Sequence, residues 1–171
     1  MTLYRIVPER SHVWIDARSN VHPIHSSTDG LEGSVELQIG SDGRVELESP
    51  PAAHLTLAVT RLSSGNGFED RELHKRIDAR RFPTIEGVLH EIRPSTPDSS
   101  YRVSGDVVFR GVTHRHEDRM TIDTVDDHTI RLQGRSRFDI RAFGMEPPKI
   151  FMLKVEPEVE VRVEIIAEGA R

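Results

Sequence analysis

Apolar and polar residues alternate strictly along much of the chain, most clearly near its C-terminal end. Every second residue from Val155 to Ala167 is valine, isoleucine, alanine or proline, and the residues between them are charged except for Ile166. Successive side chains of a strand point to opposite faces, so this pattern predicts a strand with one apolar and one charged face. A helix would spread the same residues around its whole circumference.

The same pattern recurs upstream and predicts a chain built almost entirely of strands. We expect strands at residues 2–8, 12–21, 34–39, 44–48, 54–61, 84–92, 101–111, 115–124, 128–140 and 154–167. Residues 21–33, which contain Pro23, Asp29-Gly30 and Gly33, are typical of a turn-rich connection. Strands with one apolar face must curl to bury those faces together. The sequence therefore predicts an all-β fold, an antiparallel barrel or sandwich of eight or more strands, in one domain over residues 1–171.

One stretch has helical spacing instead. Leu73 and Ile77 lie four residues apart among charged residues, which predicts a short amphipathic helix over about 70–82. Asp70 can cap its start, and Pro83 prevents its extension. Two apolar residues cannot hold a helix in water, so this helix is expected to pack on the barrel, across one end.

Opposite charges lie on the outer faces of the last two predicted strands. One strand carries Arg131, Arg135 and Arg137, and the other carries Glu156, Glu158 and Glu160. Consecutive strands usually pair, and charge pairs across a ladder contribute roughly 0.2–1 kcal/mol each. We expect these two strands to be neighbours, with the charges fixing their register rather than forming a site.

Composition excludes several classes of function. The net charge of −5 argues against nucleic-acid binding, because phosphates require a clustered basic surface. The absence of cysteine excludes disulfides, thiolate metal sites and cysteine nucleophiles. Residues 1–5 carry no apolar signal-peptide core and no run reaches transmembrane length, so the chain is expected to be soluble and cytoplasmic.

The candidate catalytic and metal-binding residues do not form a recognisable site. Among nine histidines, the pairs His22/His25 and His114/His116 could each supply two metal ligands, but no spacing fixes a third. The segment 63–67 lacks the pattern of a nucleophilic serine or of a phosphate-binding loop. We therefore expect no metal, no cofactor and no catalysis, with most histidines exposed in loops or at strand ends and most carboxylates on outward strand positions.

Several short motifs, in this order, resemble those of the YceI-like family of lipocalin-like, polyisoprenoid-binding domains. They are Ser11-His12, Leu62-Ser63-Ser64-Gly65-Asn66, Asp70-Arg71-Glu72-Leu73-His74, Asp78-Ala79-Arg80-Arg81-Phe82-Pro83-Thr84-Ile85, Gly105 followed by Gly111-Val112-Thr113, and Phe138-Asp139-Ile140-Arg141-Ala142-Phe143-Gly144-Met145. The resemblance spans nearly the whole chain. It implies an extended antiparallel barrel of eight strands around an elongated apolar cavity that can hold a long-chain isoprenoid or similar lipid.

On this interpretation the inward apolar residues bind the lipid. They are Val13, Ile15, Ala17, Leu37, Leu57, Val59, Ile85, Val103, Val107, Phe109, Leu132, Phe138, Ile140, Phe143, Val159 and Val161. Small inward residues such as Gly87, Gly105, Gly134 and Ser136 would leave volume unfilled. The alternative is that the glycines mark bends or bulges and the barrel is filled by its own side chains. A filled barrel would act through its surface, as a protein-interaction module or a homodimer.

The segment 141–153 is long for a connection between neighbouring strands. It contains the apolar residues Phe143, Met145, Ile150, Phe151 and Met152. Apolar residues in a loop must cover something or be covered. The segment is expected either to form the cavity portal or a partner surface, or to fold back and plug the barrel.

Overall fold

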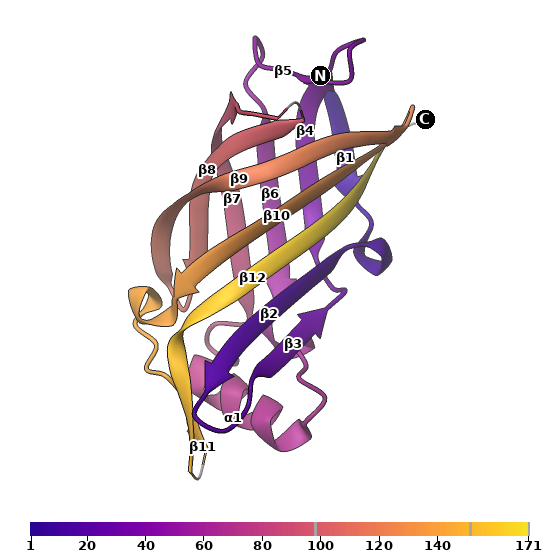
Figure 1. Ribbon diagram of the computed structural model, residues 1–171. Coiled ribbons are helices and arrows are strands. Elements are labelled where there is room, and N and C mark those ends of the chain that lie inside the picture. Colours follow the sequence, from indigo (N-terminus) through magenta and orange to yellow (C-terminus); the bar gives the residue numbers. More distant parts are fainter. Residues whose placement is uncertain (98, 151, 171) are drawn as a thin grey trace.

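A closed, curved sheet forms the body of the protein (Figure 1). The computed structural model describes residues 1–97, 99–150 and 152–170. Within this part of the chain, eight strands follow one another around a ring, and every neighbouring pair is antiparallel. In ring order they are β1 (Thr2–Ile6), β4 (Glu32–Ile39), β6 (Ala52–Ala58), β7 (Thr84–Pro94), β8 (Ser100–Phe109), β9 (Val112–Asp126), β10 (Thr129–Asp139) and β12 (Leu153–Gly169). The expected antiparallel barrel is confirmed.

The ring closes because β12 is long enough to pair with two strands along one edge. Its C-terminal end pairs with β1, with Ile6 opposite Ala167. Its middle pairs with β2 (His12–Ser19), with Trp14 opposite Arg162. A further strand, β3 (Ile24–Thr28), pairs with the other edge of β2. The expectation of a turn-rich connection over residues 21–33 was therefore wrong, since Ile24 is the one large apolar residue of β3 and gives no alternation signal.

Ser11 joins the ladder at the point where β12 changes partner. A 3-10 turn, η1 (Pro8–Arg10), separates β1 from β2. The Ser11 side chain is fully buried. Its hydroxyl donates a hydrogen bond to the Ile166 carbonyl oxygen (3.2 Å) and accepts one from the Ile166 N–H (3.0 Å). A side chain thus satisfies both backbone groups of a β12 residue where the neighbouring strand is interrupted.

Ser11→Ala should lower the free energy of unfolding by about 1–3 kcal/mol, because it leaves the Ile166 N–H without this partner, whereas the Ile166 carbonyl keeps the hydrogen bond from the Val7 N–H (2.9 Å). Urea denaturation measures the change, and a shifted midpoint at constant slope is expected. Ser41→Ala, in an exposed turn, is the control and should be neutral. A Ser11→Ala protein as stable as the parent would show that the hydroxyl is dispensable.

The helix forms, but earlier than the sequence spacing predicts. It is α1 (Gly67–Ile77), not 70–82, and it lies across one end of the barrel (Figure 1). Asn66 rather than Asp70 caps it, accepting hydrogen bonds from the N–H groups of Phe68 (3.1 Å) and Glu69 (3.2 Å). It ends before Pro83 is reached, because Asp78 takes a left-handed conformation (φ 57°).

The remaining elements shorten predicted strands or, in the case of β11, add a short strand within the segment 141–153. They are β5 (Val45–Glu46), η2 (Val59–Arg61), η3 (Ile140–Phe143) and β11 (Lys149–Ile150). The predicted strand 54–61 ends at Ala58, after which the chain turns through η2. The predicted strand 128–140 similarly gives way to η3 after Asp139.

β10 and β12 are neighbours over their full common length, as expected. On their outer face Arg135 lies 3.4 Å from Glu160, and Arg137 lies 3.7 Å from Glu158. Arg131 does not join this ladder of charges: it lies opposite Ile166 and pairs instead with Asp123 of β9. The interstrand charge pairing is confirmed for two of the three arginines.

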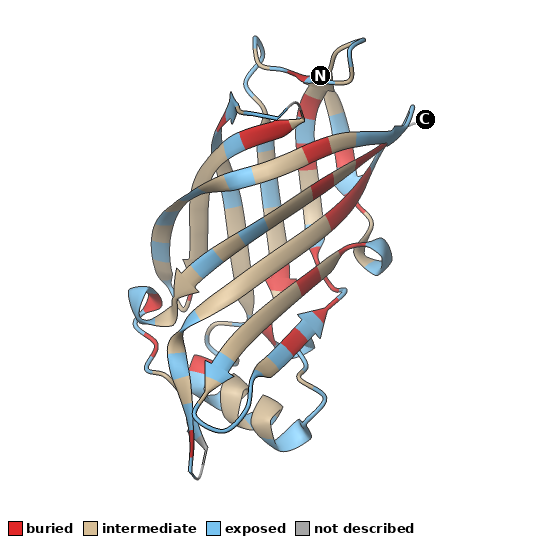
Figure 2. Cartoon of the chain, in the orientation of Figure 1, coloured by how far each residue is buried: buried red, intermediate tan, exposed pale blue. Residues whose placement is uncertain are grey.

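Buried residues gather at the two ends of the barrel and are sparser along its middle (Figure 2). At the end near the two termini, one cluster contains Leu37, Ile122, Ile130 and Ile165. At the end near α1, a second cluster contains Val59, Ile77, Phe109, Phe143 and Met145. The strands between these clusters enclose the space described next.

Candidate functional site

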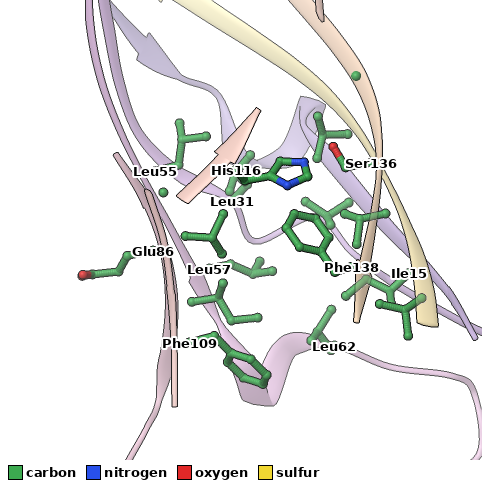
Figure 3. A pocket seen from close by; sticks show the side chains of 18 of the residues that line it. Ile15, Leu31, Leu55, Leu57, Leu62, Glu86, Phe109, His116, Ser136 and Phe138 are labelled. Atoms are coloured by element: carbon green, nitrogen blue, oxygen red, sulfur yellow. The ribbon is translucent and has the colours of Figure 1, made fainter. Parts of the chain in front are cut away.

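An apolar cavity of about 430 Å³ lies inside the barrel. Its wall is formed by side chains of the ring strands other than β1 and of β2 and β3, together with residues of α1 and η3 (Figure 3). This volume falls within the range of small-molecule sites, roughly 300–1,000 Å³. The barrel is therefore not filled by its own side chains, which argues against the filled-barrel alternative.

Nearly all the residues predicted to bind a ligand lie at this wall. Fifteen of the sixteen line the cavity, from Val13 on β2 to Val161 on β12. The exception is Val59, which is fully buried in the cluster next to α1. The chain leaves β6 one residue earlier, at Ala58, so the alternation that placed Val59 with Leu57 no longer applies. Contact of the other fifteen with a ligand stays a prediction.

The small inward residues have two different roles. A Cβ atom added at Gly87 would lie 3.8 Å from Leu55, in ordinary contact, so this glycine leaves room at the wall. A Cβ added at Gly105 would lie 2.4 Å from the Val88 carbonyl oxygen, where β7 carries a bulge next to Leu89. Both interpretations of the glycines hold, each at a different position: Gly87 adds volume, and Gly105 accommodates the bulge.

The segment 141–153 closes the α1 end of the cavity. Phe143 and Met145 are buried and line the cavity, with the Phe143 ring edge-on to Phe109 (5.6 Å between centroids). The Arg110 side chain donates hydrogen bonds to the carbonyls of Phe143 and Gly144, fixing this segment to the turn between β8 and β9. These contacts favour the expectation that the segment folds back and plugs the barrel.

The tip of the same segment points outward. Met152 is 83% exposed. Its carbonyl accepts a hydrogen bond from the Asn20 side chain (2.9 Å), and Lys154 N–H donates to Asn20 (2.6 Å), so the tip is tied to the β2–β3 loop. Phe151, which the sequence also assigned to this apolar group, lies outside the described residues, and so does the side chain of Ile150.

A carboxylate holds the rim of the cavity at the start of α1. Asp70 accepts hydrogen bonds from the hydroxyls of Ser63 (3.1 Å) and Ser64 (2.7 Å) and from the Ser64 N–H (2.9 Å). Burial opposes ionisation of this carboxyl, but the bonds from Ser64 and Ser63 outweigh it and lower the pKa of Asp70. Asp70 therefore holds Ser63 and Ser64 against the start of α1, and it is not the helix cap predicted from the sequence.

Asp70→Asn should lower protein stability near neutral pH and leave it unchanged in acid. A carboxyl whose pKa falls on folding contributes stability that is present above its unfolded pKa, about 3.9, and is lost as pH falls through the lower folded value. Thermal denaturation of both proteins from pH 7 downward measures this convergence. Glu72→Gln removes another carboxylate of α1 as the control. A difference in stability between Asp70→Asn and the parent that persists below the folded pKa would contradict a stabilising role of the ionised carboxylate.

Sequence reasoning missed two polar residues at the cavity wall, His116 and Asp118 of β9. Both line the cavity, and Figure 3 shows the His116 ring pointing into it beside Phe138, whereas the Glu86 side chain points away. The two rings lie 4.3 Å apart between centroids. Strand parity could have identified both residues. They occupy every second position of β9 together with Met120 and Ile122, so they share the face that points to the core.

The other candidate histidines, His22, His25 and His114, do not line the cavity. His25 lies 2.6 Å from the Asp16 carboxylate, and His22 lies 3.7 Å from that of Glu69. His114 packs edge-on against Phe143. In the parts of the chain that the structure describes, no three histidine or carboxylate side chains are grouped as a metal site would require.

The comparison with protein-family models decides the family. The model of the YceI-like domain matches residues 4–167. The chain belongs to the YceI-like family. No curated protein matches it. The helix found among the described residues is too short and too polar to cross a bilayer.

Solved structures show the same fold at low sequence identity. Burkholderia cenocepacia BcnA is 16% identical, with a TM-score of 0.78, covering 94% of this chain and 98% of that one. A polyisoprenoid binding domain from Saccharophagus degradans is 12% identical, with a TM-score of 0.78, covering 99% and 100%. The Campylobacter jejuni YceI protein is 11% identical, with a TM-score of 0.63, covering 81% and 82%. These three structures share the fold described above.

Proposed function

We propose that this YceI-like protein binds one long apolar lipid, a polyisoprenoid, inside its barrel and performs no catalysis. The observation that carries the proposal is the apolar cavity of about 430 Å³. Support for the ligand class comes from a neighbour of the same fold that is described as a polyisoprenoid binding domain.

Burial of the hydrocarbon chain would supply the affinity. Each methylene moved from water to the cavity contributes about 0.8 kcal/mol. Association opposes this with a loss of translational and rotational freedom of about 4–15 kcal/mol. Ten buried methylenes would supply about 8 kcal/mol, which exceeds only the lower part of this cost, so a long chain is favoured over a short one.

The test is native mass spectrometry combined with solvent extraction of protein purified from its own source. One retained lipid per chain, of defined mass and with an isoprenoid fragmentation pattern, is the expected result. The same spectrum reports the mass of the assembly and so tests the homodimer expected as an alternative. Protein that carries no lipid and takes up none from added isoprenoids would overturn the proposal.

A further inference from the structure

The polar residues His116 and Asp118 lie next to one another on the inward face of β9, in a wall formed mostly by apolar side chains. The Nε2 atom of His116 lies 3.5 Å from Oδ2 of Asp118, which is longer than a hydrogen bond. This nitrogen is buried and has no hydrogen-bond partner among the described residues. Buried polar groups without partners cost about 1–3 kcal/mol, so such a pair in a lipid cavity requires an explanation.

Both side chains are fixed by their surroundings. The His116 ring stacks on Phe138, and the other carboxylate oxygen of Asp118 accepts a hydrogen bond from the Arg119 N–H (2.8 Å). The hydrogen-bonded register of β9 with β10 ends at Met120 opposite Gly134, just before this pair. Continued by two residues, that register would place Ser136, another cavity-lining residue, opposite Asp118.

The geometry determines which part of the imidazole can meet a ligand. Nε2 is buried beside Asp118, so Nδ1 is the ring nitrogen that remains available to bond a ligand. In a neutral ring whose Nε2–H points at Asp118, Nδ1 accepts a hydrogen bond; in a protonated ring it donates one. A hydroxyl can both donate and accept, so it satisfies either state.

Charge excludes the anionic alternatives. The Asp118 carboxylate lies next to the imidazole in a cavity of low polarity, where a phosphate or carboxylate headgroup would meet a like charge. The cavity-lining residues around this pair are Phe138, Met120 and Ser136, none of them cationic.

We propose that His116, positioned by Asp118, binds the hydroxyl group of an isoprenoid alcohol inside the barrel. This rests on the proposed lipid binding and deepens it: the ligand is a neutral amphiphile whose polar group lies within the cavity, and neither a plain hydrocarbon nor an anionic lipid. The imidazole is the binding group, and the carboxylate orients it.

Equilibrium dialysis against three probes of one carbon skeleton tests this: geranylgeraniol, the corresponding hydrocarbon and geranylgeranyl monophosphate. The protein should bind the alcohol about tenfold more tightly than the hydrocarbon, the effect of one hydrogen bond in a dry site. It should also prefer the alcohol to the monophosphate.

Three variants separate the contribution of the His116 ring nitrogens from that of the Asp118 charge. His116→Phe keeps the ring on Phe138 but removes its nitrogens, and should bring alcohol and hydrocarbon within about twofold of each other. His114→Phe changes a neighbour that packs on Phe143 and does not line the cavity, and should keep the parent's preference. Asp118→Asn removes the charge and should narrow the gap between alcohol and monophosphate.

Failure of the proposed hydroxyl site can be distinguished from failure of the proposed lipid binding. Parent protein that binds alcohol and hydrocarbon equally, or binds the monophosphate most tightly, would overturn the hydroxyl site while leaving lipid binding intact. A His116→Phe protein that keeps the alcohol preference would do the same. Binding of none of the three probes would contradict lipid binding itself and, with it, this site.

Discussion

Ser136→Phe is expected to abolish isoprenoid binding while leaving the fold intact. Ser136 lines the cavity on β10, between Gly134 and Phe138 on the inward face. A phenyl ring at this position would occupy space that about four chain methylenes would otherwise fill. At about 0.8 kcal/mol each, their loss weakens binding by roughly a hundredfold or more.

The stability of the same variant tests whether the lumen is empty. In a filled core the added ring would force a rearrangement costing about 1–3 kcal/mol. In a cavity it buries new apolar surface and should leave the melting temperature unchanged or raise it. Ser136 is a better position than Gly134, where an added Cβ would already lie 3.1 Å from the Met120 side chain.

Arg137→Phe is the matched control for Ser136→Phe. It places the same ring on the next residue of β10, where the side chain is 72% exposed and faces outward. It removes only an exposed ion pair with Glu158, worth about 0–1 kcal/mol. Isoprenoid binding should match the parent's. Equal binding by Ser136→Phe and Arg137→Phe would show that the ligand does not occupy this part of the lumen.

Gly105→Ala should destabilise the barrel by about 2–3 kcal/mol. The added Cβ would lie 2.4 Å from the Val88 carbonyl oxygen and 3.2 Å from its carbon. These are backbone atoms held by the pairing of β7 with β8 beside the bulge, so they cannot move without breaking ladder bonds.

Gly87→Ala provides the comparison at another inward position of the same sheet. Its added Cβ would be 3.8 Å from the Leu55 side chain, so it should change the free energy of unfolding by less than about 1 kcal/mol, with stabilisation expected from the stiffer unfolded chain. Urea denaturation of both variants measures the difference. Equal stabilities would mean that Gly105 is not required by the bulge.

Strand positions were predictable from the sequence wherever one face of a strand is buried. In β12 the alternation of valine with glutamate fixed both the strand and its inward face, and its pairing with β10 followed from chain order. β3 was not predicted because its inward positions after Ile24 are Ser26 and Thr28. These two polar residues are buried in the fold although they are not hydrophobic.

Local ends were harder to predict because several residues compete to set them. Asn66 and Asp70 are both good helix caps, but Asn66 caps α1, and Asp70 lies inside the helix and accepts hydrogen bonds from Ser63 and Ser64 of the preceding loop. Val59 has the right parity for the cavity, but β6 ends at Ala58 and η2 begins at Val59. Such choices depend on the contacts that form in the folded chain, which the propensities of single residues do not specify.

The cavity wall was predictable, whereas its volume and its polar site were not. Inward parity identified fifteen wall residues, but whether they leave a space depends on bulges and on Phe143 closing the end. Most histidines were expected to be exposed and most carboxylates to face outward, because charged residues usually do, and His116 and Asp118 were not singled out as wall residues. Their shared parity with Ile122 was the signal that should have outweighed this average.

The central claim is that the ligand lies inside the barrel, and methyl NMR of protein mixed with geranylgeraniol tests it most directly. The valines provide reporters on both sides: Val107 and Val161 line the cavity, whereas Val21 and Val125 are exposed outside it. Nuclear Overhauser contacts from the lipid chain to Val107 and Val161 are the predicted result. Contacts confined to Val21 and Val125, with the inner valines unchanged, would contradict the account.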